Sequence, residues 1–168
     1  MHKAFRELRH YKNSDYSPGR KTLVLLIWYY FSLLCMENGL FPISRAKVFL
    51  LRIFGAKIGA GVVIKPNVRI KFPWRLTVGD HCWIGQEVWI DNLANVTLES
   101  DVCISQGAYL CTGSHDHRSP TFELKVAPIL VKHGAWIAAK AIILQGAVIE
   151  AGEVVSAGAV VGKRVSGK

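Results

Sequence analysis

The feature that most constrains this sequence is a period of six residues. From Ile58 onward a large aliphatic residue returns at every sixth position, with two eight-residue steps and one longer break. A period of six matches neither the 3.6 residues of an α-helical turn nor the two-residue alternation of a β-strand, so the pattern predicts a repeat architecture. The series comprises Ile58, Ile64, Ile70, Val78, Ile84, Ile90, Leu98, Ile104, Leu110, Val131, Ile137, Ile143, Ile149, Val155 and Val161.

A six-residue unit is explained by one short strand and one tight turn, which together make one side of a three-sided coil. Three such units return the chain one strand spacing, about 4.8 Å, further along the axis. The aliphatic residue then points inward on every side, and the residue four places later lies beside a corner, where Ala135, Ala141 and Ala147 are small. The sequence therefore predicts an all-β fold, a parallel β-helix. An ordinary β-sandwich of short strands is disfavoured because it would not keep this period.

The residues before the repeats have a different character. Residues 1–20 are polar and basic and are expected to be loosely held. Residues 22–36 are apolar and predict a helix that ends near Asn38 and Gly39, and residues 44–54 predict a second helix with Ser44 as its N-cap. The chain thus divides into an N-terminal helical segment, 1–54, and a repeat domain, 55–168.

Charge is concentrated in the first half of the chain. The sequence has 21 Lys and Arg against 12 Asp and Glu, and residues 1–80 contain 14 of the basic and four of the acidic residues. The uncharged run 22–36 is shorter than the roughly 20 residues of a membrane-spanning helix. We therefore expect this segment either to lie on a membrane surface or to cap the repeats with its cations simply solvated. No nucleic-acid-binding module is recognisable in it.

The expected location is the cytoplasm, either free or at the inner face of the membrane. Four cysteines form no closely spaced pair, and no secretory signal opens the chain, so a reducing compartment is predicted.

Several motifs in the repeat region resemble a known family. The hexad pattern, the broken phase containing Thr112-Gly113-Ser114-His115, and the later runs 136–139, 143–149 and 157–161 resemble the hexapeptide-repeat acyltransferases. The apolar, basic front segment joined to residues 54–59 looks most like the colanic-acid or exopolysaccharide O-acetyltransferase branch. The resemblance implies a left-handed coil, a homotrimer with sites between subunits, and acetyl-coenzyme A as co-substrate.

The broken phase holds the densest polar cluster of the repeat region, residues 114–118. Acetyl transfer from a thioester to a hydroxyl requires a base, and imidazole titrates in the range suited to that role. By the family's Thr-x-x-His motif the catalytic base is His115, with His117 as the alternative or as a substrate contact. A solvated turn is the structural alternative. A metal site is disfavoured because no further cluster has ligand spacing, so no metal is expected.

The resemblance also assigns a groove for coenzyme A. Trp136 would border the pantetheine arm close to His115, Ala139 and Ala157 would leave room for it, and Gly162 with Lys163 would meet the phosphates. The family often has Gly-Ser or Gly-Ala after Trp-Ile, and Thr before Lys, where this chain has Ala138-Ala139 and Gly162. The small residues could instead serve the corners alone, and Lys163 could be a solvated charge.

Asp91 and Asn92 fall in the second eight-residue step, where related sequences present polar corners to a sugar. The alternative is that both residues simply favour a turn. The function predicted from the sequence is an acetyl-coenzyme A-dependent O-acetyltransferase that acts on a sugar hydroxyl, free or lipid-linked, in exopolysaccharide biosynthesis. The alternatives are a catalytically silent scaffold or binding protein, and an acetyltransferase for another acceptor such as serine, a drug or a free sugar.

Overall fold

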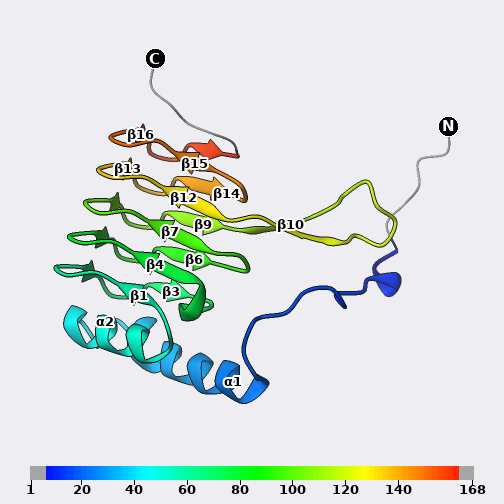
Figure 1. Ribbon diagram of the computed structural model, residues 1–168, viewed down its shortest axis with the longest axis horizontal. Helices are drawn as coiled ribbons and strands as arrows, with labels where there is room; N and C mark the ends of the chain where they lie inside the picture. Colours follow the sequence, from blue (N-terminus) through cyan, green and yellow to red (C-terminus); the bar gives the residue numbers. More distant parts are fainter. Residues whose placement is uncertain (1–6, 163–168) are drawn as a thin grey trace.

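A computed structural model of the chain describes residues 7–162, which form a three-sided parallel β-helix closed at one end by helices (Figure 1). Each of its five turns contributes one strand to each of three faces, and all pairings within a face are parallel. The first face consists of β1 (Lys57–Ile58), β4 (Leu76–Val78), β7 (Val96–Leu98), β12 (Ile129–Val131) and β15 (Val148–Ile149). The second face consists of β2 (Val63–Ile64), β5 (Trp83–Ile84), β8 (Cys103–Ile104), β13 (Trp136–Ile137) and β16 (Val154–Val155). The third face consists of β3 (Arg69–Ile70), β6 (Trp89–Asp91), β9 (Tyr109–Cys111), β14 (Ile142–Leu144) and β17 (Val160–Val161).

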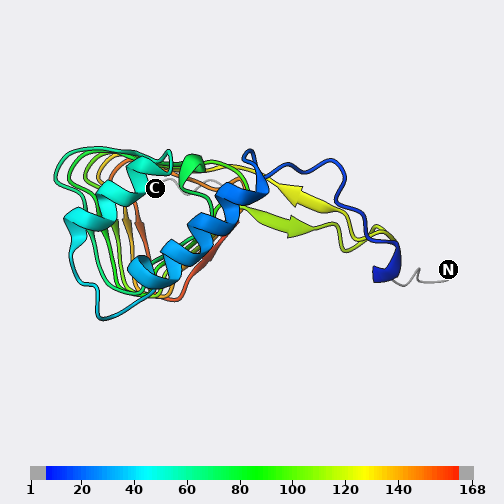
Figure 2. The same cartoon turned by 90° about the horizontal axis from the view of Figure 1, so that it is seen from below.

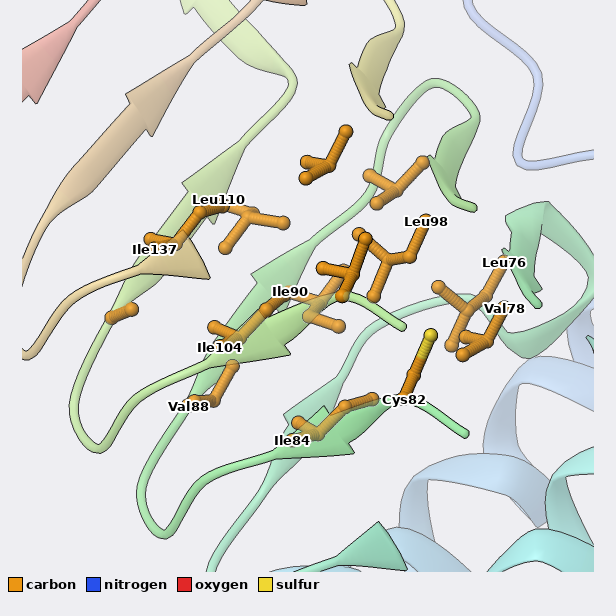
Figure 3. Packing of buried hydrophobic residues seen from close by; sticks show 14 of the residues in the cluster. Leu76, Val78, Cys82, Ile84, Val88, Ile90, Leu98, Ile104, Leu110 and Ile137 are labelled. Atoms are coloured by element: carbon orange, nitrogen blue, oxygen red, sulfur yellow. The ribbon is translucent and has the colours of Figure 1, made fainter. Parts of the chain in front are cut away.

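The hexad residues fill the interior of the coil, as the period predicted. On the second face Ile84, Ile104 and Ile137 are aligned by the strand register and are at most 1% exposed. Figure 3 shows these side chains pointing into the coil beside their counterparts from neighbouring turns. Each aliphatic residue therefore packs on its copies above and below, and truncating one to alanine typically costs about 2–5 kcal/mol.

All three breaks in the period lie at the same corner of the coil, between the third and the first face. The first break contains the 3₁₀ helix η3 (Pro73–Arg75), and the second contains residues 92–95. The third contains an antiparallel hairpin of β10 (Gly113–His115) and β11 (Leu124–Val126), which projects away from the coil (Figures 1 and 2). We call this corner, residues 71–75, 92–95 and 112–128, the insertion corner.

The helical segment covers the first turn of the coil, as Figure 2 shows from below. Helix α1 (Thr22–Phe31) continues into a π-helical turn, η2 (Ser32–Met36), so the predicted helix over 22–36 is confirmed. Helix α2 (Ser44–Ile53) follows. No helix within residues 7–162 has the length and apolar character needed to cross a bilayer.

Two predicted helix caps are wrong. The first helical stretch ends at Met36, but its C-cap is Glu37, whose N–H donates to the Ser32 carbonyl, and not a glycine near residue 39. Ser44 is not an N-cap, because Ile43 occupies that position without a side-chain bond. The Ser44 hydroxyl instead accepts the N–H of Ile64 at 2.8 Å, which joins α2 to the coil.

Residues 7–20, before α1, are held in place, contrary to our expectation, while residues 1–6 lie outside the described part of the chain. After a short 3₁₀ helix, η1 (Leu8–His10), the chain runs along the hairpin and back to the coil (Figure 1). The Glu7 N–H donates to the Pro120 carbonyl, and the Tyr16 hydroxyl donates to the Leu93 carbonyl at 3.1 Å. The indole of Trp74 donates to the Pro18 carbonyl at 2.7 Å. Hydrogen bonds that involve aromatic side chains and proline carbonyls therefore hold this segment against the coil and its hairpin. Its many charged residues alone had suggested that it would be loose in solvent.

Candidate active site

The hairpin is anchored to the coil by a buried threonine. Thr112 is fully buried, and its hydroxyl donates to the Asp91 carbonyl at 3.0 Å while accepting the Ala94 N–H at 2.9 Å. Residue 112 is thereby tied to the break in the preceding turn. From this point the chain leaves the coil as β10, where His115 pairs with Leu124 across the hairpin.

The imidazole of His115 is oriented by contacts on three sides. Its Nδ1 lies 2.8 Å from the Phe122 carbonyl, its ring stacks on the Phe122 ring with centroids 4.3 Å apart, and Tyr11 presents an edge at 5.6 Å. A carbonyl can only accept a hydrogen bond, so Nδ1 carries the proton. In the neutral imidazole Nε2 is therefore the basic nitrogen, held in one direction by the stacked rings.

The backbone at Phe122 serves this arrangement. Its φ is +51°, in the left-handed region that a bulky side chain rarely adopts. Sequence reasoning missed Phe122 and Tyr11, which both contact the imidazole. Phe122 is the one aromatic residue of the polar run 112–125, which was a usable signal, whereas Tyr11 shares its stretch with Phe5 and Tyr16 and nothing singled it out.

Charged side chains stabilise the outer part of the hairpin. Lys125 Nζ lies 2.8 Å from Asp116 Oδ2, and the Asp116 N–H donates to the Glu123 carbonyl. The hydrogen bond from Lys125 lowers the pKa of the Asp116 carboxyl to about 2. His117, the second candidate histidine, is exposed in the turn that closes the hairpin.

The depressed pKa of Asp116 predicts a pH limit for the order of the hairpin. An unfolded aspartate titrates near 3.9, so this carboxylate favours the ordered hairpin above about pH 4, and its contribution is lost as the pH falls toward 2. Asp116→Asn should remove the pH dependence and increase amide exchange at residue 116. Hydrogen exchange followed between pH 2 and 6 measures both effects. Exchange that is equally slow in the variant would contradict this role.

Asp91 and Asn92 differ in what they can offer a ligand. Asn92 is fully buried, its Oδ1 accepts the Phe72 N–H at 2.9 Å, and its Nδ2 donates to the Phe72 carbonyl at 2.7 Å. Its amide joins two turns of the coil, which favours the structural alternative for this residue.

The Asp91 carboxylate is mostly buried, with its side chain 14% exposed. Its Oδ1 is enclosed, with the Lys71 ammonium at 2.9 Å. The Tyr109 hydroxyl lies 3.4 Å from Oδ2. Burial raises the pKa of this phenol, so it stays protonated and donates. Asp91 still lines the groove beside helix α1, so its carboxylate borders a space that a ligand could fill.

The residues assigned to coenzyme A lie on another part of the coil. Trp136 is on the second face, 47% exposed, and its indole donates to the Ser105 hydroxyl at 2.8 Å. Ala139 and Ala157 lie at the corner between the second and third faces in successive turns, where the Gly158 N–H donates to the Ala139 carbonyl. Gly162 is exposed after β17, and Lys163 lies outside the described residues.

A single chain does not bring these two groups together. The second face lies opposite the insertion corner, from which the hairpin carries His115 outward (Figure 2). His115 and Trp136 can therefore share a site only between two chains. The hairpin of one chain would have to reach the second face of the other chain, or the edge of that face.

Comparison with known proteins identifies relatives of the repeat region. No family model matches the chain. It is 46% identical over 102 residues to the putative colanic acid biosynthesis acetyltransferase WcaF of Escherichia coli K12, covering 61% of this chain and 56% of the relative. It is 31% identical over 107 residues to nodulation protein L of Rhizobium leguminosarum bv. viciae, covering 61% and 55%. The chain thus spans little more than half the length of these relatives.

Solved structures share the fold. The hexapeptide-repeat acetyltransferase VCA0836 of Vibrio cholerae O1 biovar eltor, in complex with acetyl-coenzyme A, superimposes with a TM-score of 0.77 at 21% identity, covering 94% of this chain and 87% of that one. A maltose O-acetyltransferase of Clostridium difficile 630 gives a TM-score of 0.70 at 18% identity, covering 87% and 81%. These agreements confirm the resemblance and the fold class drawn from the residues.

Proposed function

We propose that this chain, which has the fold of the hexapeptide-repeat acetyltransferases, transfers acetyl groups from acetyl-coenzyme A to a sugar hydroxyl. The observation that carries the proposal is the imidazole of His115, whose Nδ1 is held by the Phe122 carbonyl so that Nε2 is free to accept a proton. It is supported by the 46% identity to a relative whose name describes a colanic acid biosynthesis acetyltransferase. Exopolysaccharide biosynthesis is the proposed setting.

The proposed reaction is direct transfer in a ternary complex. His115 Nε2 takes the proton of the acceptor hydroxyl as its oxygen attacks the thioester carbonyl carbon. The new C–O bond forms, the C–S bond breaks, and the imidazolium returns the proton to the departing thiolate. The Phe122 carbonyl stabilises the imidazolium through its Nδ1–H, and the stacked rings keep Nε2 aimed at the acceptor.

The proposed site lies between subunits of a homotrimer. In this arrangement the hairpin of one chain places His115 beside the second face of a neighbour, where Trp136 borders the pantetheine arm. The small side chains of Ala139 and Ala157 leave space along the same edge. VCA0836, which shares the fold, is described in complex with acetyl-coenzyme A, and this supports the same donor here. Gly162 and Lys163 remain the proposed phosphate contacts.

For the acceptor we propose contacts with Asp91. Asp91 lines a pocket next to the insertion corner, and its carbonyl binds the Thr112 hydroxyl that anchors the hairpin, so we propose that its Oδ2 accepts a hydrogen bond from a sugar hydroxyl. Asn92 is omitted because both ends of its amide bind the Phe72 backbone. His117 stays a proposed acceptor contact at the end of the hairpin.

The experiment that tests the proposal is a thiol-release assay with acetyl-coenzyme A and a panel of acceptors. Free sugars, lipid-linked sugars, serine and an amino-sugar drug separate the acceptor classes. Release that depends on a sugar is expected. A catalytically silent scaffold would bind coenzyme A without release for every acceptor, and that outcome would refute the proposal.

We also propose peripheral contact between the helical segment and an anionic membrane. The end of the coil exposes many large apolar side chains, and residues 20–79 contain ten Lys and Arg but a single Glu. We expect the protein to sediment with anionic vesicles but not with zwitterionic vesicles. Equal sedimentation with both would contradict a contribution of the basic residues to membrane binding. The exposed apolar residues are Leu23, Leu26, Ile27, Tyr29, Tyr30, Phe31, Leu33, Leu34, Leu40, Ile43, Phe49 and Ile53.

A further inference from the structure

An apolar groove lies between helix α1 and the third face of the coil. Leu25, Leu26 and Tyr29 form the helical wall, while Phe72 and Trp89 belong to the opposite wall. Its volume is about 510 Å³, within the range of pockets that bind small molecules. The groove is separate from the coenzyme A edge described above.

The groove is held open by the way α1 is attached. Trp28 is 3% exposed, its indole donates to the Ile70 carbonyl at 2.9 Å, and its ring packs 5.0 Å from that of Phe54. This anchor, together with the ion pair between Glu37 and Arg69, fixes the helical stretch beside the third face. Leu26 and Tyr29 remain 51% and 57% exposed, so apolar surface lines a preformed space that the chain itself does not fill.

Two ion pairs line the groove, one toward each corner. Lys71 pairs with Asp91 at 2.9 Å where β3 and β6 end, beside the insertion corner, and Arg69 pairs with Glu37 at 3.2 Å at the start of β3. Since Lys71 already has a carboxylate, the end at the insertion corner carries little net charge. It suits a neutral polyhydroxyl group better than an isolated anion.

The end formed by Lys71 and Asp91 leads toward the hairpin. The Asp91 carbonyl binds the N–H and the hydroxyl of Thr112, the residue immediately before β10. At about 3.3 Å per residue along a strand, the Cα atom of His115 lies roughly 10 Å from that of Thr112. A ligand that fills the groove can therefore extend its polar group from Asp91 toward the proposed base.

We propose that this groove binds the hydrocarbon chain of an amphiphilic acceptor whose sugar head group lies at Lys71 and Asp91. The inference rests on the proposed function, because the bound sugar head group would be the group that is acetylated. It narrows the acceptor of that reaction to a lipid-linked sugar. The apolar wall excludes water from the chain, and the pair of Lys71 and Asp91 orients the head. The groove also adjoins the exposed apolar side of α1, from which a lipid in a bilayer would enter.

Calorimetric titration of the full chain without acetyl-coenzyme A tests the groove directly. The probes are decyl maltoside, kept below its critical micelle concentration, and maltose, which has the same head and no chain. Burial of several methylene groups predicts that decyl maltoside binds at least roughly 10-fold more tightly than maltose. Equal affinities would overturn the proposal.

Two exposed leucines on the same helix provide matched variants. Leu26→Gln, inside the groove, should weaken decyl maltoside binding by roughly 5-fold or more, whereas Leu23→Gln, which is 67% exposed and outside it, should not. Leu25→Trp, which fills the groove, is a second blocking variant, and circular dichroism verifies that all three variants fold. Equal weakening by the Leu23 and Leu26 variants would assign binding to the general apolar surface and refute the groove.

Further readouts separate this inference from its rivals. If decyl maltoside dissociates an oligomer in sedimentation velocity, the groove is an interface between copies and the proposal fails. If free sugars support thiol release but no chain binds, the proposed function stands and the groove is refuted. If the chain binds while thiol release never occurs, the groove stands and the proposed function fails.

Discussion

Replacing His115 with alanine is expected to reduce acetyl transfer by roughly 100-fold or more while leaving coenzyme A affinity unchanged. A 100-fold loss corresponds to about 2.7 kcal/mol of transition-state stabilisation. The reason is geometric, because Nδ1 of the imidazole is committed to the Phe122 carbonyl and Nε2 alone can take the acceptor proton. Steady-state thiol release gives the turnover number, and calorimetry with coenzyme A gives the affinity.

His117→Ala is the matched control, because it removes an exposed imidazole from the same hairpin. We expect it to change the apparent KM for the acceptor more than the turnover number. If His117→Ala abolishes turnover and His115→Ala does not, the two roles are exchanged. Unchanged turnover in both variants would remove the hairpin from the chemistry.

Mixing two inactive variants should restore activity. His115→Ala lacks the base, and Ala157→Trp places a large side chain in the proposed pantetheine groove. If hairpin and groove come from different chains, each trimer that contains both variants keeps one intact pair, so roughly a third of the sites in the doubly purified sample are intact. Co-expression with two different tags, purification through both and measurement of thiol release would reveal this recovery.

The control for this complementation is co-expression of His115→Ala with His115→Asn, which should stay inactive. If each site were built within one chain, the mixture of His115→Ala and Ala157→Trp would stay inactive, because every chain would lack either the base or the groove. Activity near zero in that mixture would therefore contradict the intersubunit site. Sedimentation velocity on the mixed sample verifies that the variants assemble.

The coil could be predicted from the sequence because its determinant is local and repeated. Ile84, Ile104 and Ile137 occupy equivalent positions in their hexads, and one packing rule explains their burial. The hand of the coil could not be predicted in this way. The expectation of a left-handed coil came from the family resemblance, and no property of the hexads determines it. Helix 22–36 was predictable from its apolar run, whereas the role of Ser44 depended on a strand 20 residues away.

The candidate site was predictable only in part. The polar cluster around His115 was visible, but the groups that orient the imidazole come from Phe122 and Tyr11, and nothing in a linear pattern pairs these residues. Asn92 shows the opposite case. Its side chain type suggested a ligand contact, but the register between turns directs its amide to the Phe72 backbone.

The concentration of all sequence interruptions at the insertion corner has a consequence for engineering. Two edges of the prism keep strict spacing through every layer, so added residues there would shift the packing of everything beyond them. The remaining edge already accommodates a short helix, a bend and a long hairpin without disturbing the layers. Added residues for new acceptor preferences should therefore be tolerated at the tip of the hairpin, residues 117–120, which leaves Asn92, Thr112, Asp116 and Phe122 in place, and poorly tolerated at the other two edges.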